Sequence, residues 1–188
     1  MDLGISGKTA LVSASSAGLG YASALALAEA GCKTVISGRN EERLMHAASK
    51  IPNSIPITAD VSTVKGSQTL VQDAKSQLGT NIDILITNAG GPPTGTFAST
   101  DVDQYLSAIE LNLMSVVAMC KETVPDMQEK KWGRILAITS ISVRQPIPNI
   151  MLSNTARAGV TGFLKTMALE IASDGVTVNS IQPGLHAT

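Results

Sequence analysis

The sequence predicts an α/β fold, a doubly wound parallel sheet with helices on both faces, on two observations. Short runs of branched apolar residues alternate with longer helical patterns from one end of the chain to the other. These runs are continuously apolar, as strands that are buried on both faces of a parallel sheet require. We therefore expect the element order βαβαβαβαβαβ.

Six strands can be assigned to the apolar runs, with helical stretches between them. The strands are expected at residues 8–14, 33–37, 54–59, 82–87, 134–140 and 176–181. The first helix, 19–30, is apolar nearly all round and ends at Gly31, which readily adopts left-handed backbone. Three signals mark the next two helices: Asn40 caps the second, Ser62 or Thr63 begins the third, and Gly79 ends it.

Two longer helices follow. Thr100 and Asp103 resemble a capping box at the start of the fourth helix, which Pro125 ends or kinks. The fifth helix is expected at about 149–172. The apolar residues of the fourth helix are spaced three and four apart, and we interpret them as core. The alternative is a surface for a second subunit. These residues are Val102, Leu106, Ile109, Leu113, Val116 and Cys120.

The composition describes one globular domain. The chain has 188 residues, of which 44% are apolar and 15% charged, and no repeat, low-complexity segment or linker interrupts it. We expect residues 1–188 to form a single dinucleotide-binding domain. With 14 Lys and Arg against 15 Asp and Glu, the net charge is −1, and the basic residues are scattered. We therefore expect no nucleic-acid partner.

The cellular setting is indicated by what the sequence lacks. Cys32 and Cys120 lie in apolar surroundings without metal-ligand spacing, so we expect reduced core thiols and no metal. No apolar stretch reaches the roughly 20 residues of a membrane span, and the N-terminus lacks the basic start of a signal peptide. We expect a cytoplasmic protein that does not contact membranes.

A small-residue turn follows the first strand and indicates a dinucleotide site. Backbone N–H groups in such a turn, at the start of a helix, can approach a pyrophosphate. The alternative is a tight packing turn without a ligand. The candidate cofactor residues of this turn are Ser13, Ser15, Ser16, Gly18, Leu19 and Gly20.

The end of the second strand favours NADP(H) over NAD(H). An NAD-binding protein carries an acid there for the ribose hydroxyls, whereas this chain has Arg39, which would pair with a 2′-phosphate. A solvated charge is the alternative for Arg39. Asp60, followed by Val61, could bind an adenine amino group after the third strand, and helix capping is the alternative for Asp60.

Four further motifs resemble those of the short-chain dehydrogenases/reductases. They are Asn88-Ala89-Gly90, Asn112 in Leu111-Asn112-Leu113, Ser140 in Thr139-Ser140, and Pro183-Gly184. The resemblance covers the whole chain and is greatest to 3-oxoacyl-acyl-carrier-protein reductases. It implies a Rossmann fold, a nicotinamide cofactor and a carbonyl or alcohol substrate of the 3-oxoacyl thioester kind. It also implies catalytic roles for Asn112 and Ser140, and cofactor contacts at 88–90, Pro183, Gly184 and Thr188.

The chain departs from the family at two catalytic positions. Family members carry Tyr and Lys where the spacing from Ser140 gives Ser153 and Arg157. An alkanol is a much weaker proton donor than a phenol, whose pKa is about 10. We expect Ser140, Ser153 and Arg157 to form an oxyanion site, with water delivering the proton and Arg157 also reaching the cofactor ribose. His186 is a second candidate acid, with a structural role as the alternative.

Two more departures concern the backbone and the length. Ala14 replaces a motif glycine, so we expect a remodelled turn or a position that is not left-handed. Family members run to about 250 residues, so we expect a C-terminal truncation that leaves out a seventh strand. The sixth strand would then be an open sheet edge, and we expect a homo-oligomer, a dimer or tetramer, to cover it.

Two functions remain open. The first is an NADP-dependent oxidoreductase with an atypical active site. The second is a catalytically impaired dinucleotide-binding protein, a sensor or assembly subunit, which the joint loss of Tyr and Lys favours.

Overall fold

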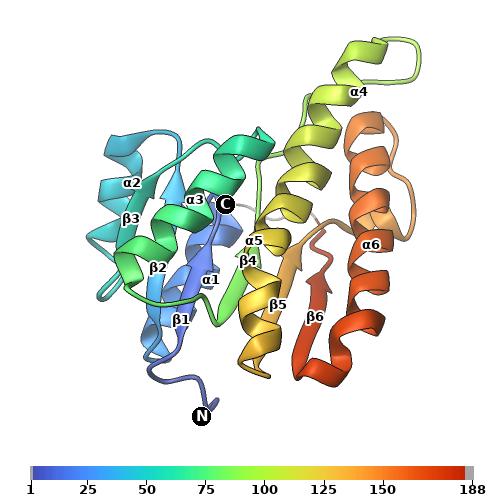
Figure 1. Cartoon of the computed structure of the whole chain (residues 1–188). Helices are drawn as coiled ribbons and strands as arrows, with labels where there is room; N and C mark the ends of the chain where they lie inside the picture. Colours follow the sequence, from blue (N-terminus) through green and yellow to red (C-terminus); the bar gives the residue numbers. More distant parts are fainter. Residues whose placement is uncertain (1, 185–188) are drawn as a thin grey trace.

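Residues 2–184, which this computed structural model describes, form a six-stranded parallel sheet with helices on both faces (Figure 1). The strand order is β3-β2-β1-β4-β5-β6. The predicted doubly wound fold is confirmed, and the predicted strands are each found with ends shifted by at most two residues. The strands are β1 Thr9–Val12, β2 Lys33–Gly38, β3 Ile55–Thr58, β4 Ile84–Thr87, β5 Gly133–Ile138 and β6 Val176–Ile181.

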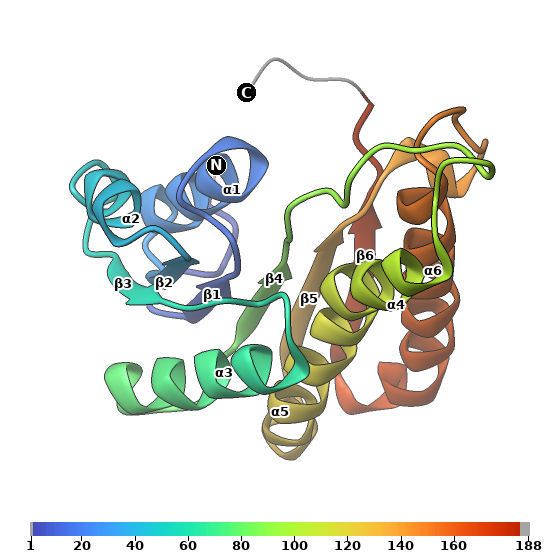
Figure 2. The same cartoon turned by 90° about the horizontal axis from the view of Figure 1, so that it is seen from above.

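The helices cover the two faces unequally. Helices α1 and α2 lie on one face, over the half of the sheet that contains β1–β3, and α3, α5 and α6 lie on the other (Figure 2). A π-helical turn, Glu110–Met114, joins α4 to α5. The helices are α1 Gly18–Glu29, α2 Glu41–Ala48, α3 Val64–Leu78, α4 Val102–Ile109, α5 Ser115–Glu129 and α6 Met151–Ile171.

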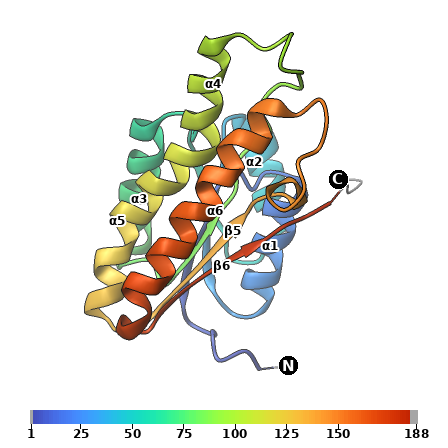
Figure 3. The same ribbon diagram turned by 90° about the vertical axis from the view of Figure 1, so that its right-hand side faces the viewer.

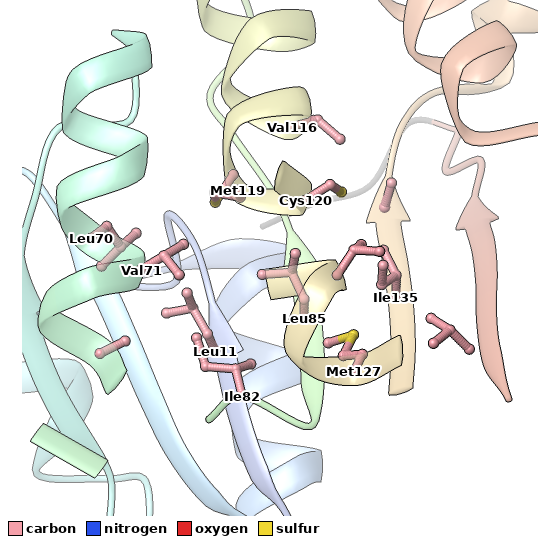
Figure 4. Close-up of a cluster of buried hydrophobic side chains, with 14 of the residues drawn as sticks. Leu11, Leu70, Val71, Ile82, Leu85, Val116, Met119, Cys120, Met127 and Ile135 are labelled. Atoms are coloured by element: carbon pink, nitrogen blue, oxygen red, sulfur yellow. The ribbon is translucent and has the colours of Figure 1, made fainter. Parts of the chain in front are cut away.

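Alternate strand residues supply two separate cores, because successive side chains of a strand point to opposite faces. On β1, Leu11 packs into the core under α3, α5 and α6, while Ala10 and Val12 pack under α1 and α2. The first core contains long side chains such as Leu85 and Met119, both fully buried (Figure 4). Both faces of the central strands are therefore apolar, as the continuous apolar runs predict.

The predicted helix ends are mostly confirmed. The Asn40 side chain accepts a hydrogen bond from Arg43 N at 2.8 Å, and Thr63 accepts from Gly66 N at 3.0 Å. Gly79 ends α3 with a left-handed φ of 70°. Gly31 also has a left-handed φ, 87°.

The capping box predicted at Thr100 and Asp103 is wrong by one residue. The Thr100 hydroxyl donates to Thr96 O at 2.7 Å, so it belongs to the preceding turn. Asp101 caps α4 instead, and its amide donates to the Gln104 side chain at 2.8 Å.

Of the two alternatives for Pro125, that it ends the fourth helix is wrong, because α5 continues through it to Glu129. Proline leaves the carbonyl of Lys121, four residues earlier, without its helical donor. Both residues are exposed, so water can satisfy that carbonyl. The predicted long helix is instead interrupted at the π-helical turn, which separates α4 from α5.

The apolar stripe of the fourth helix is divided by this turn. Val116 and Cys120 on α5 are buried, at 7% and 1% exposed, as predicted for core. Val102 and Leu106 on α4 are 79% and 65% exposed, so their assignment to the core is wrong. Helix α4 extends beyond the end of the sheet (Figures 1 and 3). No helix within residues 2–184 is long and apolar enough to span a membrane.

A buried carboxylate forms hydrogen bonds at the end of the sheet where its strands begin. Asp83, 4% exposed, accepts from Thr9 N at 3.1 Å and pairs with the Lys130 ammonium. Burial by itself raises the pKa of Asp83, but the hydrogen bonds from Lys130 and Thr9 outweigh it and hold the pKa below its ordinary value.

Replacing Asp83 with asparagine is expected to lower the free energy of unfolding by about 1–2 kcal/mol at pH 7. Lys130 is half exposed and stays hydrated, which limits the loss. Because the pKa of Asp83 is lower in the folded than in the unfolded state (about 3.9), its contribution is complete above that pH and is lost as the pH falls through the folded value. Urea unfolding should show a constant difference above about pH 5 that shrinks in more acidic buffer; a difference independent of pH contradicts this assignment.

Candidate active site

The candidate residues gather at the carboxyl ends of the strands, around the point where the strand order reverses. From β1 the chain proceeds to β2 and β3 on one side, and β4, β5 and β6 lie on the other. In doubly wound folds the loops that diverge at such a point, here those after β1 and β4, form the crevice that binds ligands. Two hollows lie elsewhere, about 360 Å³ between α5 and α6 and about 630 Å³ beside β6, so the presence of a hollow would not by itself locate this site.

Two serines of the turn after β1 are fully buried and hold the loop in place. The Ser15 hydroxyl donates to Val12 O at 2.7 Å and accepts from Ser37 N at 3.0 Å. The Ser13 hydroxyl donates to Asn88 O at 2.7 Å and accepts from Asn88 N at 2.8 Å. Their hydroxyls are thus occupied by the protein, and Ser13 ties the loops after β1 and β4 together. Ser37 contributes to this hydrogen-bond network, but no sequence motif marks it, so the sequence analysis missed it.

Ala14, in the turn after β1, has the left-handed backbone conformation that is usual for glycine. Its φ is +46°, so the expectation of a remodelled turn, or of a position that is not left-handed, is wrong. The Ala14 amide donates to Ser37 Oγ at 3.1 Å, and its carbonyl accepts from Asn88 Nδ2 at 2.9 Å. These bonds hold Ala14 in a conformation that costs an alanine about 1–2 kcal/mol.

Ala14→Gly is expected to raise the free energy of unfolding by about 0.5–1 kcal/mol. Relief of the left-handed strain gains about 1–2 kcal/mol, and the larger entropy of glycine in the unfolded chain removes about 0.4–1 kcal/mol. Chemical denaturation measures the change. Ala22→Gly is the control, because Ala22 is exposed inside α1, where glycine relieves no strain and costs about 0.5–1 kcal/mol relative to alanine. A less stable Ala14→Gly variant contradicts the argument.

The start of α1 comes very close to this turn. A Cβ on Gly20 would lie 2.6 Å from Ala14 O and 2.7 Å from Asn88 Nδ2, closer than real contacts allow. Gly18 has a left-handed φ of +60°, and Leu19 is partly buried. Only small residues therefore permit the strand, turn and helix to meet as a phosphate-binding turn requires.

The loops after β2 and β3 bring one cation and one anion near each other. Arg39 and Asp60 are exposed, and Ser62 N donates to Asp60 Oδ1 at 2.9 Å. This backbone hydrogen bond lowers the pKa of Asp60, and the charge of Arg39 acts in the same direction. Because Thr63 caps α3, the capping alternative for Asp60 is wrong. Val61 is buried in the core, so its side chain is not available to a ligand.

Asn112 lies within the π-helical turn, 2% exposed. Its Nδ2 donates to Gly90 O at 3.0 Å, while Oδ1 is buried without a hydrogen-bond partner among the described residues. Gly90 itself is exposed and has open space where a side chain would be. Single π-helical turns are common at functional sites, and a buried oxygen without a partner indicates a place for a water or ligand donor.

Ser140 follows β5 in extended backbone. Its Oγ accepts from Ser142 N at 3.1 Å, which leaves the hydroxyl hydrogen free to donate. The chain after β6 lies beside it, because Ile141 N donates to Pro183 O at 3.0 Å. Ser142, 2% exposed with an unpartnered hydroxyl in the described chain, was missed by the sequence analysis.

Ser153 and Arg157 lie one turn apart on α6, and both are partly buried. Arg157 Nη1 donates to Ile138 O at 2.9 Å, which brings the guanidinium to the end of β5, two residues before Ser140. Burial lowers the pKa of Arg157. The Ser153 hydroxyl makes no hydrogen bond to residues 2–184. Thr188 and His186, also predicted for the site, lie outside the described residues.

These features fit a dinucleotide. The turn after β1 is shaped by small residues, Gly90 opens space above β4, and Asn112 has a buried oxygen without a partner. Ser16 lies against Gly38, where a Cβ would be 3.1 Å from its hydroxyl, so the turn and the end of β2 share one wall. The fold and the arrangement of these loops are of the kind that dinucleotide-binding α/β proteins use.

Comparison with known proteins identifies the family. A model of the short chain dehydrogenase family matches residues 8–188. The chain is 34% identical over 189 residues to a 3-oxoacyl-[acyl-carrier-protein] reductase of Synechocystis, covering 98% of this chain and 76% of the relative. The chain belongs to the short-chain dehydrogenase family, and the predicted resemblance is confirmed.

Two solved structures resemble this chain in both fold and sequence. An L-sorbose reductase from Gluconobacter frateurii, complexed with NADPH and L-sorbose, has a TM-score of 0.94 and 33% identity, covering 100% of this chain and 73% of that one. A short chain oxidoreductase from Pseudomonas aeruginosa, described as containing an atypical catalytic center, has a TM-score of 0.86 and 29% identity, covering 95% and 70%.

Proposed function

We propose that this protein reduces carbonyl groups with NADPH, and that its substrate is a ketone of the 3-oxoacyl thioester kind. One observation carries the proposal: Gly90, which accepts from Asn112, follows β4, and Ser140 follows the neighbouring parallel strand β5, to whose end Arg157 donates. The relative named as a 3-oxoacyl reductase supports the substrate class. Arg39, where an NAD-binding protein would carry an acid, supports NADPH, as does the NADPH-bound sorbose reductase.

The reaction adds a hydride to carbon and a proton to oxygen. A bound nicotinamide supplies the hydride. Ser140 donates a hydrogen bond to the carbonyl oxygen, and Ser153 is a second donor one helix turn from Arg157. The charge of Arg157 stabilises the developing alkoxide, and water delivers the proton, because neither serine is acidic enough to give one up. Asn112 Oδ1 holds a water or cofactor donor beside Gly90.

The cofactor contacts follow from the same geometry. We propose that the pyrophosphate binds at the turn after β1 through backbone amides, with Ser13 and Ser15 shaping the turn. Asp60 and Val61 lie at the adenine end, and the nicotinamide end lies near 88–90, Arg157, Pro183 and Gly184.

Oxidation of NADPH, followed by its absorbance with a panel of 3-oxoacyl thioesters and simple ketones, tests the proposal. Turnover with any thioester supports it. A protein that binds NADPH and turns over none is the silent dinucleotide binder that the loss of Tyr and Lys also favours.

A double substitution separates the two functions. If water delivers the proton in an active enzyme, Ser153→Tyr with Arg157→Lys should leave kcat unchanged or lower it, because Tyr fills the space that the water uses. In a silent binder the same change should create or strongly raise reduction, because Ser140 and Asn112 are already in place. Steady-state kinetics on one ketone decides, with each single variant as control.

A further inference from the structure

Arg157 carries a partly buried charge that no acidic residue of the described chain balances. Its guanidinium donates to Ile138 O, and the ion pairs of residues 2–184 involve Lys75, Lys130 and Lys131 instead. Arginine stays protonated at all working pH values, even where burial lowers its pKa. The positive charge is therefore a fixed property of this end of the crevice.

Apart from Asp60 at the adenine end and Glu110 on the π-helical turn, the segments that form the crevice contain no acid. No Asp or Glu occurs in residues 3–28, 84–100, 134–169 or 175–184. Glu110, on the same π-helical turn as Asn112, accepts from Val64 N at 3.4 Å and so contacts the start of α3. Ser153, whose hydroxyl does not ionise near neutral pH, supplies no negative charge either.

We propose that Arg157 makes the site bind the reduced nicotinamide cofactor more tightly than the oxidised one, and so favours carbonyl reduction. This inference rests on the proposed function, because it takes the nicotinamide to bind beside Arg157. The ring is neutral when reduced and positively charged when oxidised, so a fixed cation nearby repels only the oxidised form. With the cofactor bound there, hydride transfer would leave a cationic ring and a substrate alkoxide. The alkoxide would offset the charge of Arg157 until water protonates it, and Arg157 would then favour release of the oxidised cofactor.

Cofactor binding without substrate tests this inference. NADPH is titrated by its fluorescence, and NADP⁺ by displacement of NADPH, on the intact protein. The ratio of the two dissociation constants, NADP⁺ over NADPH, is expected to fall about tenfold from wild type to Arg157→Gln. Arg157→Lys keeps the charge and should keep the ratio. Lys165→Gln, two turns further along α6 and exposed, should also keep it.

An unchanged ratio in a folded Arg157→Gln protein overturns the inference. If that variant does not fold, the wild type decides: a ratio above about ten is expected, and a ratio near one overturns it. Wild-type protein that binds neither cofactor form overturns the proposed function, and this inference with it.

Discussion

Replacing Ser140 with alanine is expected to lower kcat for carbonyl reduction about 100-fold or more, since loss of one oxyanion donor has that effect in other enzymes. The Ser140 oxygen already accepts from Ser142 N at 3.1 Å, so its hydrogen is free to donate to a substrate oxygen. The substitution removes this donor and the acceptor of Ser142 N, and leaves the backbone of β5 in place. Steady-state kinetics with the best ketone of the panel measures the loss.

The control for Ser140→Ala is Ser49→Ala, which removes an exposed hydroxyl at the end of α2. It should leave kcat unchanged. NADPH binding should be nearly the same in both variants, because the proposed cofactor contacts lie elsewhere. Turnover that is indifferent to Ser140→Ala refutes the site assignment.

Arg39→Asp is expected to reverse the cofactor preference. In the wild type, NADPH should bind at least tenfold more tightly than NADH, because a guanidinium can form charge-assisted hydrogen bonds to a 2′-phosphate. An aspartate there repels that phosphate and accepts hydrogen bonds from the ribose hydroxyls of NADH instead. Fluorescence titration of both cofactors measures the two affinities.

Lys50→Asp provides the matched control, because it makes the same charge change at an exposed position just after α2. It should leave the order of the two affinities as in the wild type. Equal affinities of wild-type protein for NADPH and NADH would show that Arg39 is only a solvated surface charge.

The fold could be predicted from the sequence because parallel strands buried on both faces need continuous apolar runs. Thr63, Asn40 and Gly79 also act where their local chemistry predicts. Pro125 did not end its helix, since an exposed carbonyl can be satisfied by water. The division of the apolar stripe between α4 and α5 could not be predicted, because no residue type marks a π-helical turn in the sequence.

Spacing predicts where Ser140, Ser153 and Arg157 lie, after β5 and one turn apart on α6, while their catalytic roles stay predictions. The hydrogen-bonding roles of the serines and of Ala14 could not be predicted. Ser13 and Ser15 have residue types suited to phosphate, yet their hydroxyls are used inside the protein. Ala14 takes the left-handed backbone of a glycine because Ser37 and Asn88 hold it there, and neither contact is local in the sequence.

The π-helical turn has a consequence for how α4 and α5 can vary. A π turn holds one residue more than an α turn, so it rotates every side chain before it by about 100° relative to those after it. The exposed face of α4, with Val102 and Leu106, is thereby uncoupled from the buried face of α5. Substitutions on α4 can alter what this surface contacts while Met119 and Cys120 keep their packing. Deleting one residue within Glu110–Met114 would couple the two faces again and turn Asn112 away from Gly90.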